Sequence, residues 1–387
     1  MKNKILFLSS WYPSKDNPTL GNFIFKHAEC VAPMNNIFAL HVCLTKNNNQ
    51  TEEIDFNNSP FPSKIIYLQK SKIPIFGNLI DKIKLTKKYI SEYEILIKSG
   101  FKPDLIHANI AYPIGFIALL FKWKYNINYI IEEHWTGYLD FGITKPSFLK
   151  KRIIRYLANR AVAITPVSHD LGRAIKKLGI HTPIIKVANV VHVEYFTPNL
   201  NKEKSEVTKI IHISTLHNFH KNIDLLINSF SEILKSGFKA ELHIISDGDF
   251  QQYQEKISQF GIANNIVFHG ELTAEQIAPI LKEADFFVLS SNFENLPCVL
   301  IESVACGVPA ISTNVGGVSE IINELNGLLV EPNNQAQMVE AMKNMIETHH
   351  IYNKQEMHQS AIAQYSYEAI GKQLTELYAS LLQKQNQ

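Results

Sequence analysis

The stretch Val288–Gly307, VLSSNFENLPCVLIESVACG, contains the features that decide the fold of this chain. It begins as a buried strand and continues into a loop. Pro297 then begins a helix, a position that proline favours, and Gly307 ends it. Strand, loop and helix in that order form the repeating unit of a parallel α/β sheet. We expect backbone N–H groups near Asn295 and Leu296 to offer an anion site where this helix begins.

The same alternation of short apolar runs and helical patterns continues on both sides of this stretch. The first half is expected to contain strands at Lys4–Ser9, Phe38–Leu44, Lys64–Leu68, Asp104–Ala108, Tyr129–Glu133 and Ala161–Val167. The second half is expected to contain strands at Thr208–Ser214, Ala240–Ser246, Asn265–His269, Phe286–Leu289, Pro309–Ser312 and Gly327–Val330. Apolar strands separated by helices predict an α/β protein with two doubly wound, Rossmann-like domains.

A polar segment, Thr197–Ser205, divides the two series and is interpreted as a linker. The predicted domains are therefore residues 1–196 and 205–364. A final amphipathic helix over residues 365–387 is expected to pack back on the first domain. Ligands of open α/β sheets bind beyond the carboxyl ends of the strands, so we expect a functional cleft between the two domains.

Composition excludes several classes of protein. With 387 residues, 45% hydrophobic and 19% charged, the chain is neither disordered nor a coiled coil. Its longest apolar candidate, Ile110–Phe121, is too short to span a membrane, and the start lacks a signal-peptide core, so a cytoplasmic location is expected. The cysteines are far apart and are expected to be buried free thiols: Cys30, Cys43, Cys298 and Cys306.

Charge is distributed unevenly along the chain. The net charge of +2 combines +12 over residues 1–198 with −10 over residues 199–387. The basic half could face an anionic surface or substrate. Its segment Ser147–Arg160 predicts a basic amphipathic helix, which is a candidate for contact with a membrane surface. An ordinary surface helix packed on its own domain explains the same pattern equally well.

Two acidic residues bracket the start of the helix in the opening stretch. Glu294 lies before this helix and Glu302 lies inside it, among apolar residues. A carboxylate in such surroundings is costly unless it is hydrogen-bonded, and a ribose diol would supply two donors. The alternative is that Glu302 lies on the exposed stripe of a half-buried helix.

Together these residues resemble a known donor site. Glu-x7-Glu with FENLP between the acids, followed by ACGVPAISTNVGGVSEII, resembles the family 4 retaining glycosyltransferases of the GT-B fold. The resemblance implies that Glu294 contacts the transferred sugar and Glu302 binds the nucleotide ribose. Asn295 and Leu296 would belong to the same donor site. Gly316–Gly317 is expected to let a backbone loop approach a ligand closely.

The expected phosphate site departs from the family pattern. In HISTLHNFHKNIDLL, Lys221 matches the family's phosphate-binding lysine, whereas Thr215 stands where most members carry an arginine. A hydroxyl donates one hydrogen bond but brings no charge. We hypothesise that His217 and His220 compensate for the missing arginine.

The loop after the first strand resembles the glycine loop of the family. Gly21 is expected to permit close backbone approach to the donor or acceptor, and Asn22 is expected to cap the helix that follows. The form WYPSKDNPTLGNF resembles a subgroup that makes surface polysaccharides.

Two histidines are expected to follow strands at the rim of the cleft. His134 matches a family histidine near the reacting sugar and is expected to orient that sugar, with His107 as the second candidate. Glu132 and Glu133 are close by, and strand alternation should send only one of them toward the cleft.

The resemblance implies a retaining, metal-independent hexosyltransferase that needs no cofactor. Its donor would be a nucleotide-diphosphate sugar, with UDP as a guess for the nucleotide. Its acceptor would be a saccharide or a lipid-diphosphate saccharide in cell-surface polysaccharide synthesis, reached at an anionic membrane surface and without a nucleic-acid partner. The alternatives are an epimerase or phosphorylase on the same fold, or a non-catalytic nucleotide-sugar-binding subunit, which the threonine at position 215 keeps open.

Overall fold

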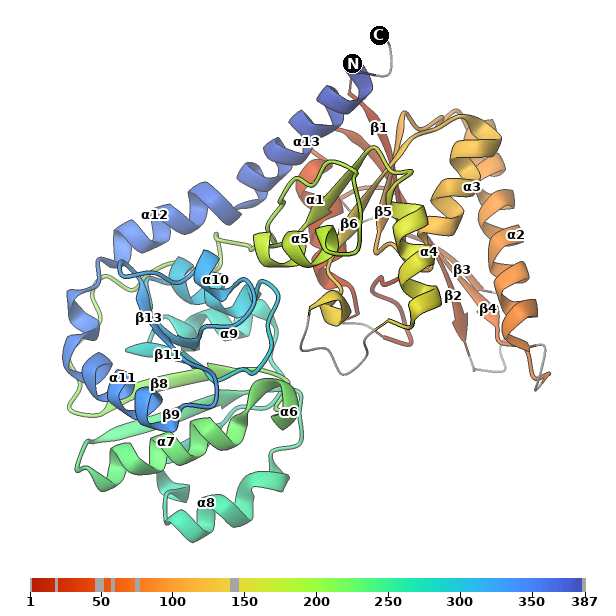
Figure 1. Cartoon of the computed structure of the whole chain (residues 1–387). Coiled ribbons are helices and arrows are strands. Elements are labelled where there is room, and N and C mark those ends of the chain that lie inside the picture. The colour runs from red at the N-terminus through yellow and green to blue at the C-terminus, as the bar shows by residue number, and fades with distance from the viewer. Residues whose placement is uncertain are drawn as a thin grey trace. The chain divides into compact units, whose positions relative to one another are not determined.

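The computed structural model of this chain divides into two compact units (Figure 1). The residues that it describes are 2–17, 20–45, 52–56, 60–73, 77–139 and 146–384. The first unit comprises Met1–Val167, Gly172–Val190 and Tyr367–Gln387. The second unit comprises Ser168–Leu171 and Val191–Ser366.

Unit 1 is built on a seven-stranded sheet with the order β3-β4-β2-β1-β5-β6-β7. All of its neighbouring strands are parallel except the β3–β4 pair. The strands are β1 (Lys4–Ser9), β2 (Asn36–Thr45), β3 (Glu52–Phe56), β4 (Ser63–Gln69), β5 (Leu105–Asn109), β6 (Tyr129–Glu133) and β7 (Ala163–Pro166). Every residue of β5 and β6 is buried, as expected for central strands covered on both faces.

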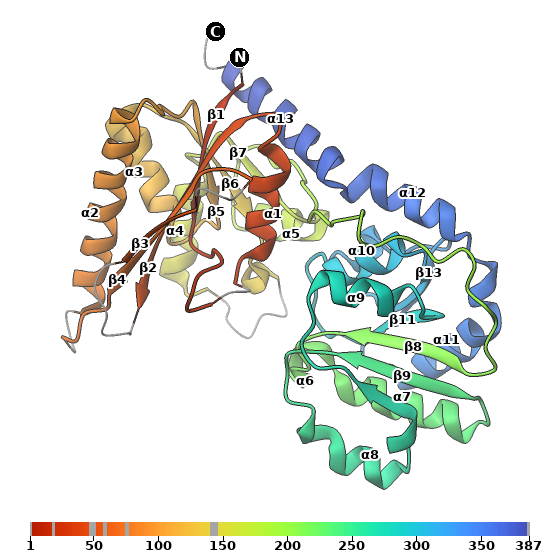
Figure 2. The same cartoon turned by 180° about the vertical axis from the view of Figure 1, so that it is seen from behind.

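Helices cover both faces of this sheet. They are α1 (Asn22–Val31), α2 (Gly77–Lys98), α3 (Gly115–Tyr125), α4 (Phe148–Ala158), α5 (His169–Lys176) and α13 (Tyr367–Gln383). Helices α1 and α13 lie together on one face, whereas α2 and α3 lie on the other (Figures 1 and 2). The two faces therefore provide separate surroundings for the residues discussed below.

The last helix packs closely against the first. A side chain at Gly371 of α13 would place its Cβ 2.2 Å from the backbone oxygen of Cys30 in α1, so glycine sets this short approach. Asn35 donates a hydrogen bond to the hydroxyl of Thr375 at 2.8 Å. Because α13 lies against α1, residues from the far end of the chain reach the interior of unit 1.

Unit 2 is built on a six-stranded parallel sheet with the order β10-β9-β8-β11-β12-β13. Its strands are β8 (Thr208–Ile213), β9 (Ala240–Ile245), β10 (Ile266–Phe268), β11 (Phe286–Leu289), β12 (Ala310–Thr313) and β13 (Gly327–Val330). Its helices are α6 (Asn218–Lys221), α7 (Ile223–Lys235), α8 (Gln254–Phe260), α9 (Ala274–Leu281), α10 (Cys298–Ala305), α11 (Gln335–Thr348) and α12 (Lys354–Tyr365). The predicted fold class, with two doubly wound Rossmann-like sheets, is confirmed.

Strands β8 and β11 are neighbours in this sheet, with Phe286 opposite Ile210 and Phe287 opposite Ile211. Their carboxyl ends therefore lie at the same edge, and the loops that follow them meet. The core beneath is formed mainly by aliphatic side chains from the strands and from α7 and α11, such as Leu226 and Met338. None of the described helices is long and apolar enough to cross a membrane.

Candidate functional site

Helix α6 and the loop that joins β11 to α10 are held together by hydrogen bonds. The Ser290 hydroxyl donates to the backbone oxygen of Lys221 at 2.8 Å. The backbone N–H of Asn292 donates to His220 O at 2.7 Å, and its side-chain amide donates to Phe219 O at 3.0 Å. These bonds hold the last turn of α6 against the loop that carries Glu294.

The structure brings Lys221 and Glu294 into direct contact. The Lys221 Nζ lies 2.6 Å from Glu294 Oε1, and the Ser291 hydroxyl donates to the same oxygen at 2.6 Å. The side chains of the lysine and the glutamate are 20% and 9% exposed. A cation and a hydrogen-bond acceptor, both reachable from solvent, are thus positioned side by side. Ser291 was missed by the sequence analysis, although it lies only three residues before Glu294.

The Gly316–Gly317 pair supports this loop from behind. A Cβ at Gly316, where φ is +55°, would lie 1.9 Å from Glu294 O, and one at Gly317 would lie 2.4 Å from Asn295 O. The backbone N–H of Gly317 donates to the same Asn295 oxygen at 2.8 Å. The close approach seen at these glycines is therefore to the backbone of Glu294 and Asn295, whereas the sequence analysis expected a ligand there.

Helix α10 starts one residue later than expected, because Pro297 is its N-cap and Cys298 its first residue. Glu302 lies inside this helix and is 8% exposed, so the alternative of an exposed stripe is wrong. Burial, and secondarily the Glu302 carboxylate, raise the pKa of the Cys306 thiol. The anion site expected near Asn295 and Leu296, and the ribose contact of Glu302, stay predictions.

Thr215 follows β8 and its side chain is exposed. Its backbone oxygen lies against Gly248, where a Cβ would come within 2.3 Å. His217 and His220 form a ring pair with centroids 4.9 Å apart. Burial, followed by the nearby His217 and Lys221 charges, lowers the pKa of His220. This shift favours the uncharged imidazole of His220 at neutral pH.

In unit 1, the helix after the first strand starts differently from the expectation. Gly21, with φ +77°, is the N-cap of α1, and Asn22 is its first helical residue, so the prediction of Asn22 as the cap is wrong. A Cβ at Gly21 would lie 2.6 Å from Trp11 O, which explains why glycine is required at this turn. Residues 18 and 19 of the expected glycine loop lie outside the described part of the chain.

The two histidines of unit 1 occupy different places. His107 lies in the middle of β5 and is fully buried, so the expectation that it follows a strand at a rim is wrong. The predicted strand Asp104–Ala108 already contained His107, and the ring is buried there because Glu132 and Tyr378 supply partners for its two nitrogens. His134 directly follows β6 and its ring contacts that of Phe23 at a tilt of 38°, with ring centroids 4.3 Å apart.

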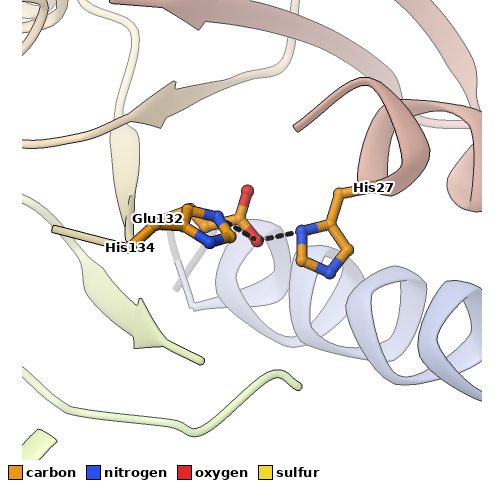
Figure 3. Close-up of side chains that lie close together, drawn as sticks. All are labelled: His27, Glu132 and His134. Atoms are coloured by element: carbon orange, nitrogen blue, oxygen red, sulfur yellow. Dashed lines mark ion pairs between the residues drawn. The ribbon is translucent and has the colours of Figure 1, made fainter. Parts of the chain in front are cut away.

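Glu132 is the centre of a buried group of histidines (Figure 3). One of its carboxylate oxygens lies 2.5 Å from His27 Nδ1 and 3.6 Å from His134 Nε2, and the other lies 3.1 Å from His107 Nε2. Tyr378 of α13 completes the group, with its hydroxyl 2.7 Å from His107 Nδ1. Three segments distant in sequence therefore converge on one carboxylate.

Opposing effects set the charges in this cluster. Burial alone would raise the pKa of Glu132, but His27, His107 and His134 together hold it well below its usual value. Burial pushes the pKa of His27 down, yet the Glu132 carboxylate outweighs it and the net shift is upward. Burial dominates at His134, whose pKa is lowered. The His27–Glu132 ion pair therefore lies at the centre of the cluster, and His27 Nε2 donates to Ala188 O at 2.9 Å.

The same cluster could hold a metal ion. One donor atom each from His27, Glu132 and His134 lies within 4.8 Å of the other two. Two imidazoles and a carboxylate are a donor set that zinc accepts. The His27–Glu132 ion pair uses the same atoms, so metal binding would have to displace the proton between them. The expectation that no metal is needed stays a prediction.

Glu133, beside Glu132, contacts a different set of groups. Its carboxylate accepts hydrogen bonds from the backbone N–H groups of Ala111 and Trp135, each at 3.0 Å, and from the Tyr138 hydroxyl at 2.8 Å. Burial, only partly offset by these bonds, raises its pKa. Glu133 thus ties the loop after β5 to the loop after β6 and positions the backbone around His134.

The sequence analysis did not single out His27. It lies on the buried face of α1, at the helical spacing of Ile24, Ala28 and Val31. The sequence signal that could have predicted this ion pair was a histidine in an apolar helical stripe together with an acid inside a buried strand. What pairs the two is the packing of α1 on β6, which no local pattern contains.

Both halves of the chain match models of known protein families. A family model described as Glycosyltransferase Family 4 matches residues 52–195, and one described as Glycosyl transferases group 1 matches residues 207–348. An uncharacterized glycosyltransferase of Methanocaldococcus jannaschii is 29% identical over 63% of this chain and 65% of its own length. The chain spans 58 to 65% of the length of the first curated relatives that it matches.

A Bacillus subtilis protein, whose name assigns it as a glycosyltransferase to teichuronic acid biosynthesis, is 24% identical over 88% of both chains. Among solved structures, HepE of Anabaena in complex with UDP has a TM-score of 0.74 and 17% identity. That match covers 98% of this chain and all of the other. At this identity the likeness concerns the fold.

Proposed function

The chain belongs to the family 4 glycosyltransferases of the GT-B fold, and on that premise we propose that it transfers a sugar from a nucleotide-diphosphate sugar to an acceptor in cell-surface glycan synthesis. The observation that carries the proposal is the contact between Lys221, Glu294 and Ser291. It places a cation and a sugar-hydroxyl acceptor together at the carboxyl edge of the unit 2 sheet, where α/β proteins bind ligands.

The roles of these side chains follow from their charges. Lys221 would stabilise the negative charge that develops on the departing diphosphate. Glu294 would accept hydrogen bonds from hydroxyls of the transferred sugar, while Ser291 holds its carboxylate in place. Without a nucleotide sugar, Lys221 and Glu294 form an ion pair with each other, so binding of the nucleotide sugar would exchange this ion pair for contacts with the ligand.

We propose a retaining transfer. The bond between the anomeric carbon and the diphosphate oxygen breaks, and the acceptor oxygen bonds to the same carbon from the same face. The acceptor proton passes to the diphosphate oxygen that leaves. Glu294, paired with Lys221 and Ser291, is suited to orienting the sugar. Lys221 would supply the positive charge toward the diphosphate, so no metal ion is required in this proposal.

The nucleotide is proposed to be UDP, because a protein of similar fold was solved with UDP. A surface glycan as product is supported by the relative whose name assigns it to teichuronic acid biosynthesis. The acceptor is proposed to be a saccharide or a lipid-linked saccharide, reached at the inner face of the cytoplasmic membrane. The excess of basic residues in the first half of the chain suits an anionic surface or acceptor.

Thermal unfolding with a panel of nucleotide sugars tests the donor. A ligand at 100 times its Kd adds about 2.7 kcal/mol to the free energy of unfolding. We expect UDP-sugars to stabilise the wild type and Lys221→Met to lose most of this stabilisation. Lys235→Met is the matched control, because Lys235 is an exposed lysine of α7 that pairs with Glu232. The donor assignment fails if none of the nucleotide sugars raises the unfolding temperature of the wild type.

The histidines near Thr215 are tested separately. We propose that His217 and His220 supply hydrogen bonds to the diphosphate in place of the missing arginine. His217→Ala and His220→Ala should each weaken donor binding and slow turnover. If donor affinity and turnover are unchanged in both variants, the compensation lies elsewhere.

Thr215 favours one further candidate, a nucleotide-sugar-binding subunit without activity, because a hydroxyl stands where the family usually has a cation. The two functions differ in turnover. Release of free nucleotide with sugar attached to an acceptor supports the enzyme, whereas tight binding with no product across an acceptor panel supports the binding subunit.

A further inference from the structure

Unit 1 contains a cavity of about 700 Å³, lined in part by Tyr12, Ser14, Asn17 and Leu20 of the loop after β1. Helices α2 and α3, which contribute to its lining, cover the face of the sheet opposite to α1 and α13 (Figures 1 and 2). Its floor comes from β2 and from the end of β1, and its walls come from α2 and α3. A volume of this size lies within the range of pockets that hold small molecules.

The lining of this cavity is largely apolar, with Leu85 of α2 and Leu119 and Leu120 of α3 among its walls. Large apolar side chains also stand at its mouth and remain exposed. Phe116, Trp123 and Tyr156 all line the cavity, and they are 45%, 64% and 44% exposed. Exposed aromatic side chains around an apolar hollow mark a surface that binds another molecule.

Several polar groups in the wall are already bonded within unit 1, whereas the buried Tyr12 hydroxyl forms no hydrogen bond within the described part of the chain. The Ser10 hydroxyl accepts from the backbone N–H of Ile114 at 3.2 Å, and the Thr86 hydroxyl donates to Lys82 O at 2.8 Å. The Tyr89 hydroxyl accepts from the backbone N–H of Val42 at 3.0 Å. Burial lowers the pKa of His41 to about 4, so this side chain is uncharged at neutral pH. The interior therefore suits a hydrocarbon better than a sugar or a nucleotide.

The helices around the mouth are basic. Lys82 lines the cavity and is exposed, and Lys150 of α4 lies 5.2 Å from the ring centroid of Tyr112, which also lines the cavity. Helices α3 and α4 contain lysines and arginines and no acidic residue. Phe148 and Leu149, in the first turn of α4, are exposed beside these charges. An apolar hollow with a cationic surround is complementary to a lipid with an anionic head group.

We propose that this cavity binds the hydrocarbon chain of a single-chain lipid diphosphate, with the phosphates held by the basic residues at its mouth, and that this lipid is the carrier of the sugar acceptor. The inference rests on the proposed function, because it names the acceptor class of the same transferase. The lipid-linked saccharide is thus preferred to a free saccharide as acceptor.

Direct binding of geranylgeranyl diphosphate, measured by calorimetry without any nucleotide sugar, tests the assignment. Thr86→Trp would fill the cavity from α2, and Leu120→Trp would fill it from α3. Ser91→Trp is the matched control, since Ser91 is an exposed residue of α2 whose hydroxyl also donates to a backbone oxygen one turn earlier. We expect the wild type and Ser91→Trp to bind alike, and the two filled variants to bind at least tenfold more weakly.

Two competitors identify what is bound. Inorganic diphosphate at the same concentration should not displace the lipid, because the chain supplies the affinity. If both filled variants bind the lipid as tightly as the wild type does, or if inorganic diphosphate displaces the lipid, the proposal is overturned. The proposal is also overturned if the proteins bind phosphatidylglycerol vesicles but not the lipid diphosphate, and if the wild type and the filled variants bind the vesicles equally. That result would indicate a surface contact without an occupied cavity.

Stabilisation by UDP, measured on the same proteins, separates this inference from the proposed function. It should be equal in all four proteins, which also shows that the filled variants are folded. If the wild type binds the lipid but no nucleotide sugar, the transferase proposal fails and the cavity assignment stands. If UDP binds and the filled variants retain the lipid, the cavity assignment fails and the transferase proposal stands.

Discussion

Replacing Gly316 by alanine tests whether the loop that carries Glu294 is held in place by the glycine pair behind it. Two costs are expected. The left-handed backbone at φ +55° disfavours any L side chain by about 1–2 kcal/mol. The added Cβ would also lie 1.9 Å from Glu294 O, and because that atom is backbone it cannot rotate away. Overpacking of this kind typically costs about 1–3 kcal/mol more.

Gly316→Ala should therefore lower the free energy of unfolding by about 2–5 kcal/mol, as measured by urea denaturation. Displacement of Glu294 by about 1 Å should lower turnover by roughly 100-fold. Gly261→Ala is the control, because Gly261 has a similar φ of +67° and nothing within 4 Å of the added Cβ. It should lose only the cost of the left-handed backbone and keep full turnover.

The two variants together test whether the contact between Gly316 and Glu294 positions the site. If Gly316→Ala loses no more stability than Gly261→Ala and keeps wild-type turnover, the contact with Glu294 does not position the site. If both variants lose turnover equally, the effect belongs to general destabilisation, and the reasoning about Glu294 is again refuted.

Three further predictions concern the interior. Glu132→Gln removes the counter-charge of the buried His27, whose imidazole would then lose its proton, so the free energy of unfolding at pH 7 should fall by about 1–3 kcal/mol in urea denaturation, and an unchanged value would contradict the ion pair. Burial lowers the pKa of His212 to about 4 from 6.5, so its stabilising contribution is complete above pH 6.5 and is lost as the pH falls toward 4. The stability difference between the wild type and His212→Gln should therefore shrink by about 2 kcal/mol from pH 7 to pH 5 in urea titrations, whereas a difference independent of pH would count against a neutral buried imidazole. Gly371→Ala would bring a Cβ within 2.2 Å of Cys30 O and should destabilise unit 1 by about 1–3 kcal/mol. Calorimetry should therefore show a lower melting temperature, and an unchanged one would contradict the close packing of α13 on α1.

The regular part of the fold could be predicted because it depends on local patterns. Apolar runs of strand length alternate with helical stripes, and both sheets contain the expected strands close to their predicted bounds. Strand β3 was not predicted. It pairs antiparallel with β4 at the edge of the sheet, and its sequence, EEIDF, lacks the apolar run by which the other strands were predicted.

The site was predicted in part. The resemblance to the family 4 glycosyltransferases singled out Glu294 and Lys221 before any contact between them was known. His107 was placed wrongly because a histidine near a strand end was assumed to lie outside it. Its burial depends on Glu132 and Tyr378, which lie on other elements and compensate its polarity.

The sequence by itself determined the order of strands and helices, the division of charge between the two halves, and the residue types available for donor binding. Only the tertiary structure decided that Lys221 meets Glu294, that Gly316 supports the backbone of Glu294, and that three histidines share Glu132. The reason is physical, because hydrophobic periodicity is a property of neighbouring residues, whereas the pairing of buried charges depends on which strands become neighbours and how closely the helices pack on them.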